Sequence, residues 1–331
     1  MRTNQAPGPA IQDPPLHEFD MGGDLARWLG RVILGPPQWV GALEISPLVL
    51  VGEPGEPFLL LHEAIETGAL EVTEQGEGNV SEVIAHNRSA RPILILEGES
   101  IRGAKQNRVI TVDVLVAAGA SVNVLVGCVE QGRWDKSKAS FGSSAMPVEP
   151  MLRAANKVQT VRGEKIDQGR LWQAVAQKLG SAGVASASQS YHAYVDEYRE
   201  RAEQGARALA AVNGQVGILV LEGGRLVGLD LLGHPRNWGA LAHRLASSYV
   251  LGSLAVAPES APRARRSREA WLQAIAASPM KARAAVGLGQ QVVLSDPALV
   301  GGGLWYDGRP AHLAVFGATT VTQPGHWVAN S

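Results

Sequence analysis

The sequence predicts an α+β fold, with a mainly antiparallel β-sheet or sandwich in the first half and helices, a returning β-hairpin and C-terminal strands in the second half. Two observations lead to this prediction. Short β-rich runs follow one another between residues 43 and 130 with only turn residues between them, which leaves no room for the crossover helices of a parallel sheet. After residue 165, apolar residues recur at helical spacing, and strands return between and after these segments.

The chain has 331 residues, of which 45% are hydrophobic, and this is enough for a sizeable buried core. We expect a lead-in with one short helix over residues 1–40, a single large domain over 41–322 and a tail over 323–331. The large domain is expected to have a β-rich part at 41–130, a polar loop at 131–165 and a mixed helical and β part at 166–322.

Charge and composition exclude several classes of protein. Thirty Lys and Arg residues against 31 Asp and Glu residues give a net charge of −1, so there is no global basic field and we expect no nucleic-acid partner. Cys128 is the only cysteine, which excludes an intramolecular disulfide and suits a reducing cytoplasm. The first 20 residues do not resemble a signal peptide, and no apolar run reaches the ~18 residues of a membrane span. We therefore expect a cytoplasmic protein without a membrane partner.

In the first half, four apolar residues at helical spacing predict one short helix within residues 22–40, which Pro36 and Pro37 would end. These four residues are Leu25, Trp28, Leu29 and Val32. The predicted strands are 48–52, 58–61, 70–74, 80–87, 92–99, 108–116 and 121–130, with a helical turn at 62–65. The AAGA sequence between the last two strands predicts that they form a hairpin.

In the second half, residues 131–165 lose periodicity and are rich in Ser, Gly and Lys, which predicts a long polar loop that is either functional or disordered. Gly223 and Gly224 lie at the centre of a predicted hairpin over 215–232. The predicted helices are 169–179, 192–212, 238–254 and one around Trp271, and the last predicted strands lie in QQVVLSD, GGGLWYDG and HLAVFGA.

The segment from residue 97 to residue 108, EGESIRGAKQNR, carries the first candidate site. Arg102, Lys105 and Arg108 lie within seven residues, and Gln106 and Asn107 separate the last two. Fixed Arg and Lys donors are what recognition of phosphate or carboxylate requires, so the segment predicts a pocket for an anionic, nucleotide-like small molecule. The alternative is a solvated charged turn before a strand.

Three carboxylates are candidates for proton transfer. Glu97 and Glu99 flank a glycine at the end of one predicted strand, and Glu130 ends another. Alternation along a strand puts Glu97 and Glu99 on one face, where repulsion would raise the pKa of one of them and make it a usable general acid or base. The alternative is that these carboxylates form ion pairs with the neighbouring arginines.

The segment CVEQGRW at 128–134 carries the second candidate site. Cys128 is either a nucleophile of low pKa or a small buried residue in a strand, and the burial tendency of free cysteine favours the second interpretation. Arg133 adds a cation, and Trp134 could stack on an aromatic base. The histidines are scattered without a metal-ligand spacing, so no metal and no other cofactor is expected.

These two strings resemble the protein family named for its association with ADP-ribosylglycohydrolases and rhodanese-phosphatase proteins. The family pattern continues with a Gln-x-x-Val-Trp helix, which 168–172 resembles, and with Gln-Val-Gly at 215–217, so the resemblance covers about residues 45–320. The chain departs from the pattern where Glu97 replaces Asp, Gly127 replaces Ser and Leu171 replaces Val. The resemblance implies a ligand derived from ADP-ribose or NAD.

Two functional hypotheses remain open at this stage. In the first, the chain is a hydrolase or transferase whose phosphate-binding cations are Arg102, Lys105, Arg108 and Arg133. Gln106 and Asn107 would bind ribose or base, Trp134 would stack, and the catalytic candidates are Glu99, Glu130 and Lys105. In the second, the chain is a non-catalytic ligand-binding protein or an oligomeric scaffold made of identical subunits. Convergence of the charges in a pocket would favour the enzyme, and mutual neutralisation would favour the scaffold.

Overall fold

The computed structural model describes residues 19–74, 81–133, 140–161, 166–254 and 265–318. Helices and antiparallel sheets are both present, which confirms the predicted α+β class. None of the helices in these residues is long and apolar enough to cross a membrane.

The largest sheet has ten strands in the order β1-β16-β17-β18-β19-β15-β14-β4-β2, and β3 also pairs with β4. Every described pair in it is antiparallel. The strands are β1 (Phe19–Asp20), β2 (Val32–Leu34), β3 (Gln38–Val40), β4 (Leu43–Leu50), β14 (Gln215–Glu222), β15 (Arg225–Leu232), β16 (Met280–Ala284), β17 (Gln290–Asp296), β18 (Leu299–Tyr306) and β19 (Arg309–Gly317).

Two smaller sheets come from the first half of the chain. One has six strands in the order β13-β9-β10-β12-β7-β6, and the other has three in the order β11-β8-β5. Their strands are β5 (Leu59–Leu60), β6 (Leu70–Glu74), β7 (Glu82–Asn87), β8 (Ile93–Ile95), β9 (Ser100–Gly103), β10 (Arg108–Ile110), β11 (Val114–Val116), β12 (Ser121–Cys128) and β13 (Phe141–Ser143). The pair β5 and β8 is parallel.

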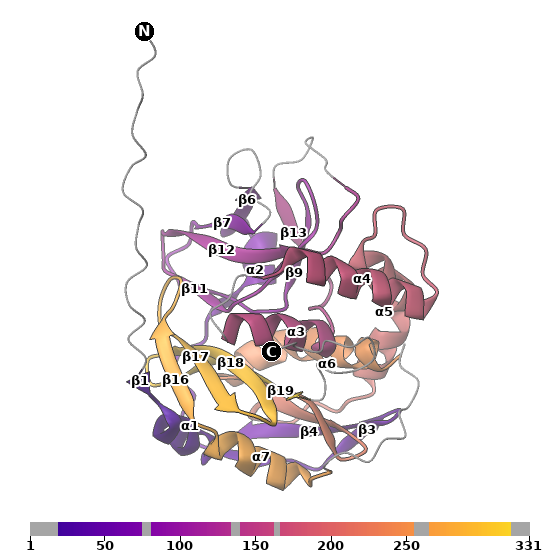
Figure 1. Ribbon diagram of the computed structural model, residues 1–331. Coiled ribbons are helices and arrows are strands. Elements are labelled where there is room, and N and C mark those ends of the chain that lie inside the picture. The colour runs from indigo at the N-terminus through magenta and orange to yellow at the C-terminus, as the bar shows by residue number, and fades with distance from the viewer. Residues whose placement is uncertain (1–18, 75–80, 134–139, 162–165, 255–264, 319–331) are drawn as a thin grey trace.

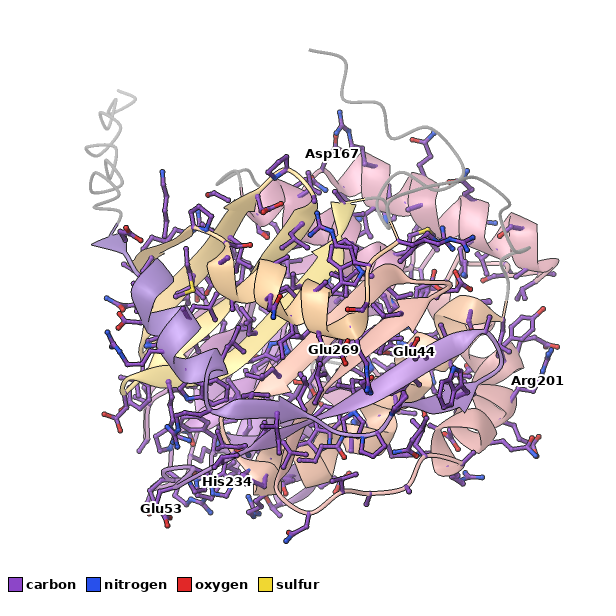
Figure 2. The ribbon with its side chains drawn as sticks, turned by 90° about the horizontal axis from the view of Figure 1, so that it is seen from below. Glu44, Glu53, Asp167, Arg201, His234 and Glu269 are labelled. Carbon is purple, nitrogen blue, oxygen red and sulfur yellow. The ribbon has the colours of Figure 1, made fainter. Side chains whose placement is uncertain are left out.

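Helices lie on both faces of the ten-stranded sheet (Figure 1). The helices are α1 (Gly22–Leu29), α2 (Leu61–Glu66), α3 (Pro150–Val161), α4 (Gln168–Ala182), α5 (Tyr191–Arg207), α6 (Pro235–Ser253) and α7 (Arg268–Ala277). Helices α2 and α4 pack against strands of the smaller sheets. Helices α1 and α7 lie on one face, where Trp28 and Trp271 join the same buried apolar cluster (Figures 1 and 2). Helices α3 and α6 lie on the other face, between this sheet and the two smaller ones (Figure 1). Arg153 of α3 and Tyr249 of α6 connect this middle layer to the ten-stranded sheet through Asp230 of β15.

The predicted strand 108–116 is two strands that belong to different sheets. β10 pairs with β12, with Arg108 opposite Cys128, so the hairpin prediction is confirmed for this part. β11 instead pairs with β8, and this part of the prediction is wrong. The break between β10 and β11 falls where two polar side chains form hydrogen bonds with other segments. Thr111 donates to the carbonyl of Leu125 at 3.1 Å, and Asp113 accepts from the backbone N–H of Glu97 at 2.8 Å.

The predicted loop at 131–165 contains an unpredicted strand, β13, and an unpredicted helix, α3. Helix α3 escaped prediction because its buried residues are largely polar. Arg153, Asn156 and Lys157 are each at most 2% exposed, so the helix shows little of the apolar periodicity that identifies an amphipathic helix. The helix at 169–179 and the hairpin at 215–232 are confirmed as α4 and the pair β14–β15, and the helix at 192–212 is confirmed as α5, which ends earlier, at Arg207.

The first predicted helix is shorter than expected. Helix α1 ends at Leu29, and Val32 begins strand β2, which pairs with β4. β3 also pairs with β4, so these elements from before residue 41 are part of the largest sheet. The domain boundaries at residues 40 and 322 remain predictions, and the predicted tail at 323–331 lies outside the described residues.

Three consecutive glycines in β18 allow the strand to approach its neighbours closely. A Cβ at Gly303 would lie 2.1 Å from the carbonyl oxygen of His312, whereas a Cβ at Gly301 would meet the side chain of Val315 at 3.0 Å. We expect Gly303→Ala to lower the free energy of unfolding by about 3 kcal/mol and Gly301→Ala by about 1 kcal/mol, because a side chain can shift and a paired backbone cannot. Urea unfolding of both variants checks this, and equal losses would contradict it.

Candidate functional site

The two strings singled out in the sequence lie side by side. The backbone N–H of Val129 donates to the carbonyl of Asn107 at 3.0 Å, and the backbone N–H of Asn107 donates to Glu130 Oε2 at 3.2 Å. The side chain of Gln106 donates to the carbonyl of Glu130 at 3.0 Å. The pairing of β10 with β12 therefore brings the GAKQNR and CVEQGRW strings together, as the antiparallel register predicted.

Two of the predicted phosphate-binding cations have carboxylate partners inside the protein. Arg108 is fully buried and lies 3.4 Å from Glu74, whose side chain is 6% exposed. Arg133 forms an ion pair with Glu130 at 2.8 Å. Glu74 was not among the predicted site residues, because nothing in the sequence links β6 to the GAKQNR string. These two arginines therefore stabilise carboxylates of their own chain.

The other two predicted cations lie nearer to the surface. Arg102 forms an ion pair with Asp196 of α5 at 2.6 Å, and their side chains are 37% and 48% exposed. Lys105 is half-buried, and its backbone N–H donates to Glu74 at 3.3 Å. An ion pair exposed to this extent contributes at most about 1 kcal/mol, so Arg102 can change partner at little cost.

The amide side chains of the same string bind internal groups. Asn107 Oδ1 accepts from the backbone N–H of Gly103 at 3.1 Å and from Arg133 at 3.0 Å. Gln106 Oε1 accepts from the thiol of Cys128 at 3.1 Å. Both side chains therefore help to fix the loop that joins β9 to β10.

Cys128 has the environment of a structural residue. It is buried, and burial raises the pKa of its thiol, so the thiol is neutral at physiological pH. The side-chain amide of Gln168 binds the backbone of Cys128 twice. Its oxygen accepts from the N–H of Cys128 at 2.8 Å, and its nitrogen donates to the carbonyl of Cys128 at 2.7 Å. Trp134, the predicted stacking residue, lies outside the described residues.

Glu99 has the protonation behaviour expected of a general acid or base. It is 1% exposed, and burial raises the pKa of its carboxyl to about 7, although the charge of Arg244 opposes this rise. Its Oε2 accepts from the backbone N–H of Leu96 at 2.9 Å, and its Oε1 has no hydrogen-bond partner among the described residues. A carboxyl with a pKa near 7 can both give and take a proton at neutral pH.

The predicted cause of this shift, repulsion by Glu97, is wrong, because burial is the largest cause of the raised pKa. Residues 97 and 98 form a turn after β8, with Gly98 at a φ of 85°, so strand alternation does not continue to Glu99. The carboxylate of Glu97 instead binds α3, at 3.0 Å from Lys157 and 3.6 Å from Arg153.

A second buried network, which the sequence did not predict, lies behind these residues. Asp230 of β15 accepts two bonds from Arg153, at 2.7 and 2.8 Å, and one from Tyr249 at 2.7 Å. His312 of β19 lies with one ring nitrogen 3.0 Å from Asp230 and the other 2.7 Å from Asp113. All five side chains are at most 1% exposed.

The charges in this network balance. Burial opposes the charge on His312, but Asp113 and Asp230 outweigh it and raise its pKa to about 9. Burial also opposes the charge on Asp230, and Arg153 outweighs it, so the pKa of that carboxyl is lowered. The network therefore holds two anions and two cations. A sequence signal could have revealed it, because Asp113, Asp230 and His312 are isolated polar residues within otherwise apolar segments. No group of three or more His, Cys, Asp or Glu in the described part of the chain is placed to hold a metal ion.

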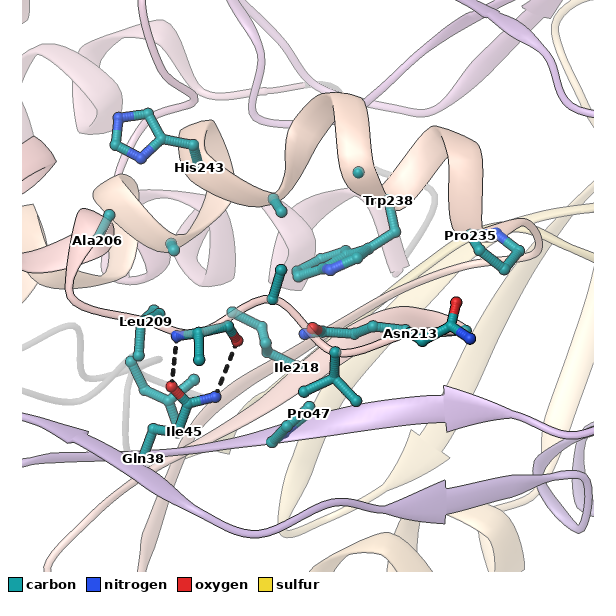
Figure 3. Close-up of a pocket in the computed structure, with 18 of the residues that line it drawn as sticks. Gln38, Ile45, Pro47, Ala206, Leu209, Asn213, Ile218, Pro235, Trp238 and His243 are labelled. Atoms are coloured by element: carbon teal, nitrogen blue, oxygen red, sulfur yellow. Dashed lines mark hydrogen bonds between the residues drawn. The ribbon is translucent and has the colours of Figure 1, made fainter.

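A cavity of about 550 Å³ lies elsewhere, between α6, the segment after α5 and strands β4 and β14 (Figure 3). Trp238, Ile45 and Ile218 contribute to its apolar lining, and the amide of Gln38 makes two hydrogen bonds with the backbone of Ala210 beside it. Among the residues that the structure describes, none of the predicted site residues lines this cavity.

Loss of the negative charge of Asp230 should strongly lower the stability of the fold. Asp230→Asn removes the negative charge that Arg153 and His312 share, so we expect the free energy of unfolding to fall by about 3–5 kcal/mol. Asp196→Asn, which breaks the exposed pair with Arg102, should change it by at most about 1 kcal/mol. Urea unfolding at neutral pH compares them, and similar losses in the two variants would refute the structural importance of the network.

Glu99 should make stability depend on pH. Its pKa rises from an ordinary 4.5 to about 7 on folding, so its stabilising contribution is complete below the unfolded pKa and is lost as the pH rises through 7. Gln does not titrate. We therefore expect the free energy of unfolding of Glu99→Gln, relative to wild type, to increase by roughly 3 kcal/mol from about pH 4 to about pH 8. Denaturant unfolding across this range measures it, with Glu53→Gln at an exposed position as the control. A pH-independent difference would show that Glu99 has no raised pKa.

Comparison with known proteins places the chain in a family. The family model described as "ARG and Rhodanese-Phosphatase-superfamily-associated Protein domain" matches residues 31–316. No curated protein and no solved structure matches the chain. The matched range contains the GAKQNR and CVEQGRW strings, Glu99 and the whole buried network. The chain therefore belongs to the family of ARG- and rhodanese-phosphatase-superfamily-associated proteins.

Proposed function

We propose that this chain is an enzyme, a hydrolase or a transferase, in which Glu99 acts as the general acid or base. The observation that carries the proposal is the buried carboxyl of Glu99, with a pKa of about 7 and one oxygen without a hydrogen-bond partner among the described residues. The carboxylates of Glu97 and Asp230 are already paired with cations of α3, whereas the carboxyl of Glu99 has a pKa of about 7 and can exchange its proton near neutral pH.

The proposed substrate is an anionic, nucleotide-like small molecule derived from ADP-ribose or NAD. Its support is the family name, with ARG understood as ADP-ribosylglycohydrolase, which records an association with enzymes of that metabolism. Lys105 of the GAKQNR string and Arg102, which directly precedes this string, lie nearer to the surface than Arg108 does. A phosphate group could replace Asp196 as the partner of Arg102. Arg108 and Arg133 would act indirectly, by positioning Glu74 and Glu130.

A second candidate function is non-catalytic ligand binding or a role as an oligomeric scaffold. Two observations favour it. The charges of Arg102, Arg108 and Arg133 are neutralised by carboxylates of the same chain. In addition, the cavity beside α6 has a size typical of small-molecule sites, and no candidate catalytic residue lines it.

Thermal stability in the presence of ADP-ribose, NAD and unrelated nucleotides tests the ligand class. A ligand present at ~100 times its dissociation constant should stabilise the wild-type protein by about 2.7 kcal/mol. Lys105→Ala should lose this stabilisation if the GAKQNR string binds the phosphates. A shift that survives Lys105→Ala and is abolished by Ala242→Trp, which fills the cavity beside α6, would support the second candidate instead.

Turnover of the stabilising nucleotide tests catalysis. Glu99→Gln keeps the size of the side chain and removes the exchangeable proton, so we expect the rate to fall by roughly 100-fold or more with binding retained. Unchanged turnover in Glu99→Gln would refute the catalytic role of Glu99. Stabilisation without any turnover would favour the ligand-binding protein.

A further inference from the structure

The cavity beside α6 has the volume and the apolar lining of a small-molecule site. It measures about 550 Å³, within the ~300–1,000 Å³ that is typical of ligand pockets. Figure 3 shows the indole of Trp238 extending from α6 toward the strands, where Ile45, Pro47 and Ile218 also line the cavity. Protein interiors are otherwise close-packed, so an apolar space of this size beside a buried tryptophan is suited to a ligand with an apolar body.

One wall of the cavity is the segment that follows α5, residues 209–214, and this wall is held in place. The side-chain amide of Gln38 donates to the carbonyl of Ala210 at 3.1 Å and accepts from the N–H of Ala210 at 2.6 Å (Figure 3). At the other end of the segment, the carbonyl of Gly214 accepts from the backbone N–H of Leu50 at 3.0 Å. The cavity is therefore formed before a ligand binds, which reduces the entropic cost of binding.

Two buried residues of the lining have a polar atom without a partner. Trp238 is 4% exposed, and its indole N–H makes no hydrogen bond with any of the described residues. Gln215 is 9% exposed, and its Nε2 donates to the carbonyl of Gly217 at 2.9 Å, whereas its Oε1 has no partner in the described part of the chain. Both atoms are accessible, in contrast to the sealed Nε1 of Trp172. The lining therefore offers one donor and one acceptor to a ligand.

The charged groups of the lining lie at its rim. Among the described residues, the ionisable ones that line the cavity are Arg207, Arg236 and His243, and all three are exposed. Arg207 lies 2.9 Å from Glu203. Arg236 lies 3.4 Å from Glu63, and neither of these carboxylates lines the cavity. A charged ligand would lose its hydration inside the cavity without gaining an ion pair, so the lining favours an uncharged ligand.

We propose that this cavity binds an uncharged aromatic amide. The aromatic ring would pack against the apolar lining, the amide carbonyl would accept from the indole N–H of Trp238, and the amide N–H would donate to Gln215 Oε1. An amide is the simplest uncharged group that supplies both an acceptor and a donor. This inference rests on the ligand-binding function proposed as the second candidate, and it involves neither Glu99 nor the GAKQNR string.

Three compounds with one ring system test the ligand class by calorimetry on the full chain. Naphthalene-2-carboxamide has both a donor and an acceptor, its N,N-dimethyl derivative lacks the donor, and naphthalene-2-carboxylate carries a charge. We expect the carboxamide to bind at least roughly 10-fold more tightly than the other two. The dimethyl derivative leaves Gln215 Oε1 unpaired, and the carboxylate loses hydration.

Two variants test the polar contacts. Gln215→Met removes the acceptor, so it should weaken binding of the carboxamide by roughly 10-fold and leave the affinity of the dimethyl derivative unchanged. Trp238→Phe removes the donor that both carbonyls use, so it should weaken both amides. Trp39→Phe is the matched control, because Trp39 is 63% exposed and lies outside the lining, and it should bind as wild type does.

Filling the cavity tests the location. Ala242→Trp should abolish binding of the carboxamide, and Ala211→Trp does the same from an exposed position of the lining if Ala242→Trp does not fold. Ala185→Trp, at an exposed position away from the cavity, is the control and should bind normally. Wild-type affinity in both filled variants would contradict the proposal. No binding of the carboxamide, equal affinity of the three compounds or tighter binding of the carboxylate would contradict it as well.

These outcomes are separable from those of the proposed function. A nucleotide that binds until Ala242→Trp fills the cavity, with no binding of the carboxamide, would keep the second candidate function and refute the ligand class. Binding of the carboxamide with unchanged turnover in Glu99→Gln would support the amide site and refute the acid–base role. Loss of turnover in Glu99→Gln without any binding of the carboxamide would do the reverse. If neither Gln215→Met nor Trp238→Phe folds, the order of the three affinities in the wild-type protein decides.

Discussion

The carboxylate of Asp230 is the group on which the interior of this protein depends. It lies in the ten-stranded sheet and binds Arg153 of α3, Tyr249 of α6 and His312 of the neighbouring strand. His312 extends the connection to Asp113, next to the three-stranded sheet. Because none of these groups reaches water, the cost of burying each charge is offset only by its partners. The carboxylate of Asp230 therefore fixes the positions of α3, α6 and the three-stranded sheet relative to the ten-stranded sheet.

This dependence explains where sequence patterns predicted the fold and where they failed. The hairpin at 215–232 and helices α4 and α5 were predictable because turn glycines and apolar spacing identify such elements locally. Helix α3 was not, because Arg153 and Lys157 occupy its buried side, and their partners lie on elements far away in the chain. Polar residues that are buried by distant partners look like surface residues in a sequence.

The same reason limits what could be predicted of the site. The pairing of β10 with β12 was readable from the sequence, which placed Arg108 near Glu130. In the structure Arg108 lies opposite Cys128, and the adjacent Asn107 binds Glu130. The partners of the arginines were not readable, because Glu74 and Asp196 lie 34 and 94 residues from the arginines that they bind. The need for a glycine at position 98 was not readable from the sequence either. A Cβ at Gly98 would lie 2.6 Å from the side chain of Arg153, so this glycine is needed for packing against α3.

The balance of charges in the interior also bears on how Glu99 could work. Each paired cation lies next to a carboxylate, so the field of the pair falls off quickly with distance. Arg244 has no such partner among the described residues, and its charge is one of the forces that keep the pKa of Glu99 from rising above about 7. In the proposed function, an anionic substrate bound beside Glu99 would add a negative charge close to this carboxyl. The carboxyl would then take up a proton more readily, because a nearby anion favours its neutral form. Substrate binding would thereby convert Glu99 into a general acid at the pH where the free protein holds it half ionised.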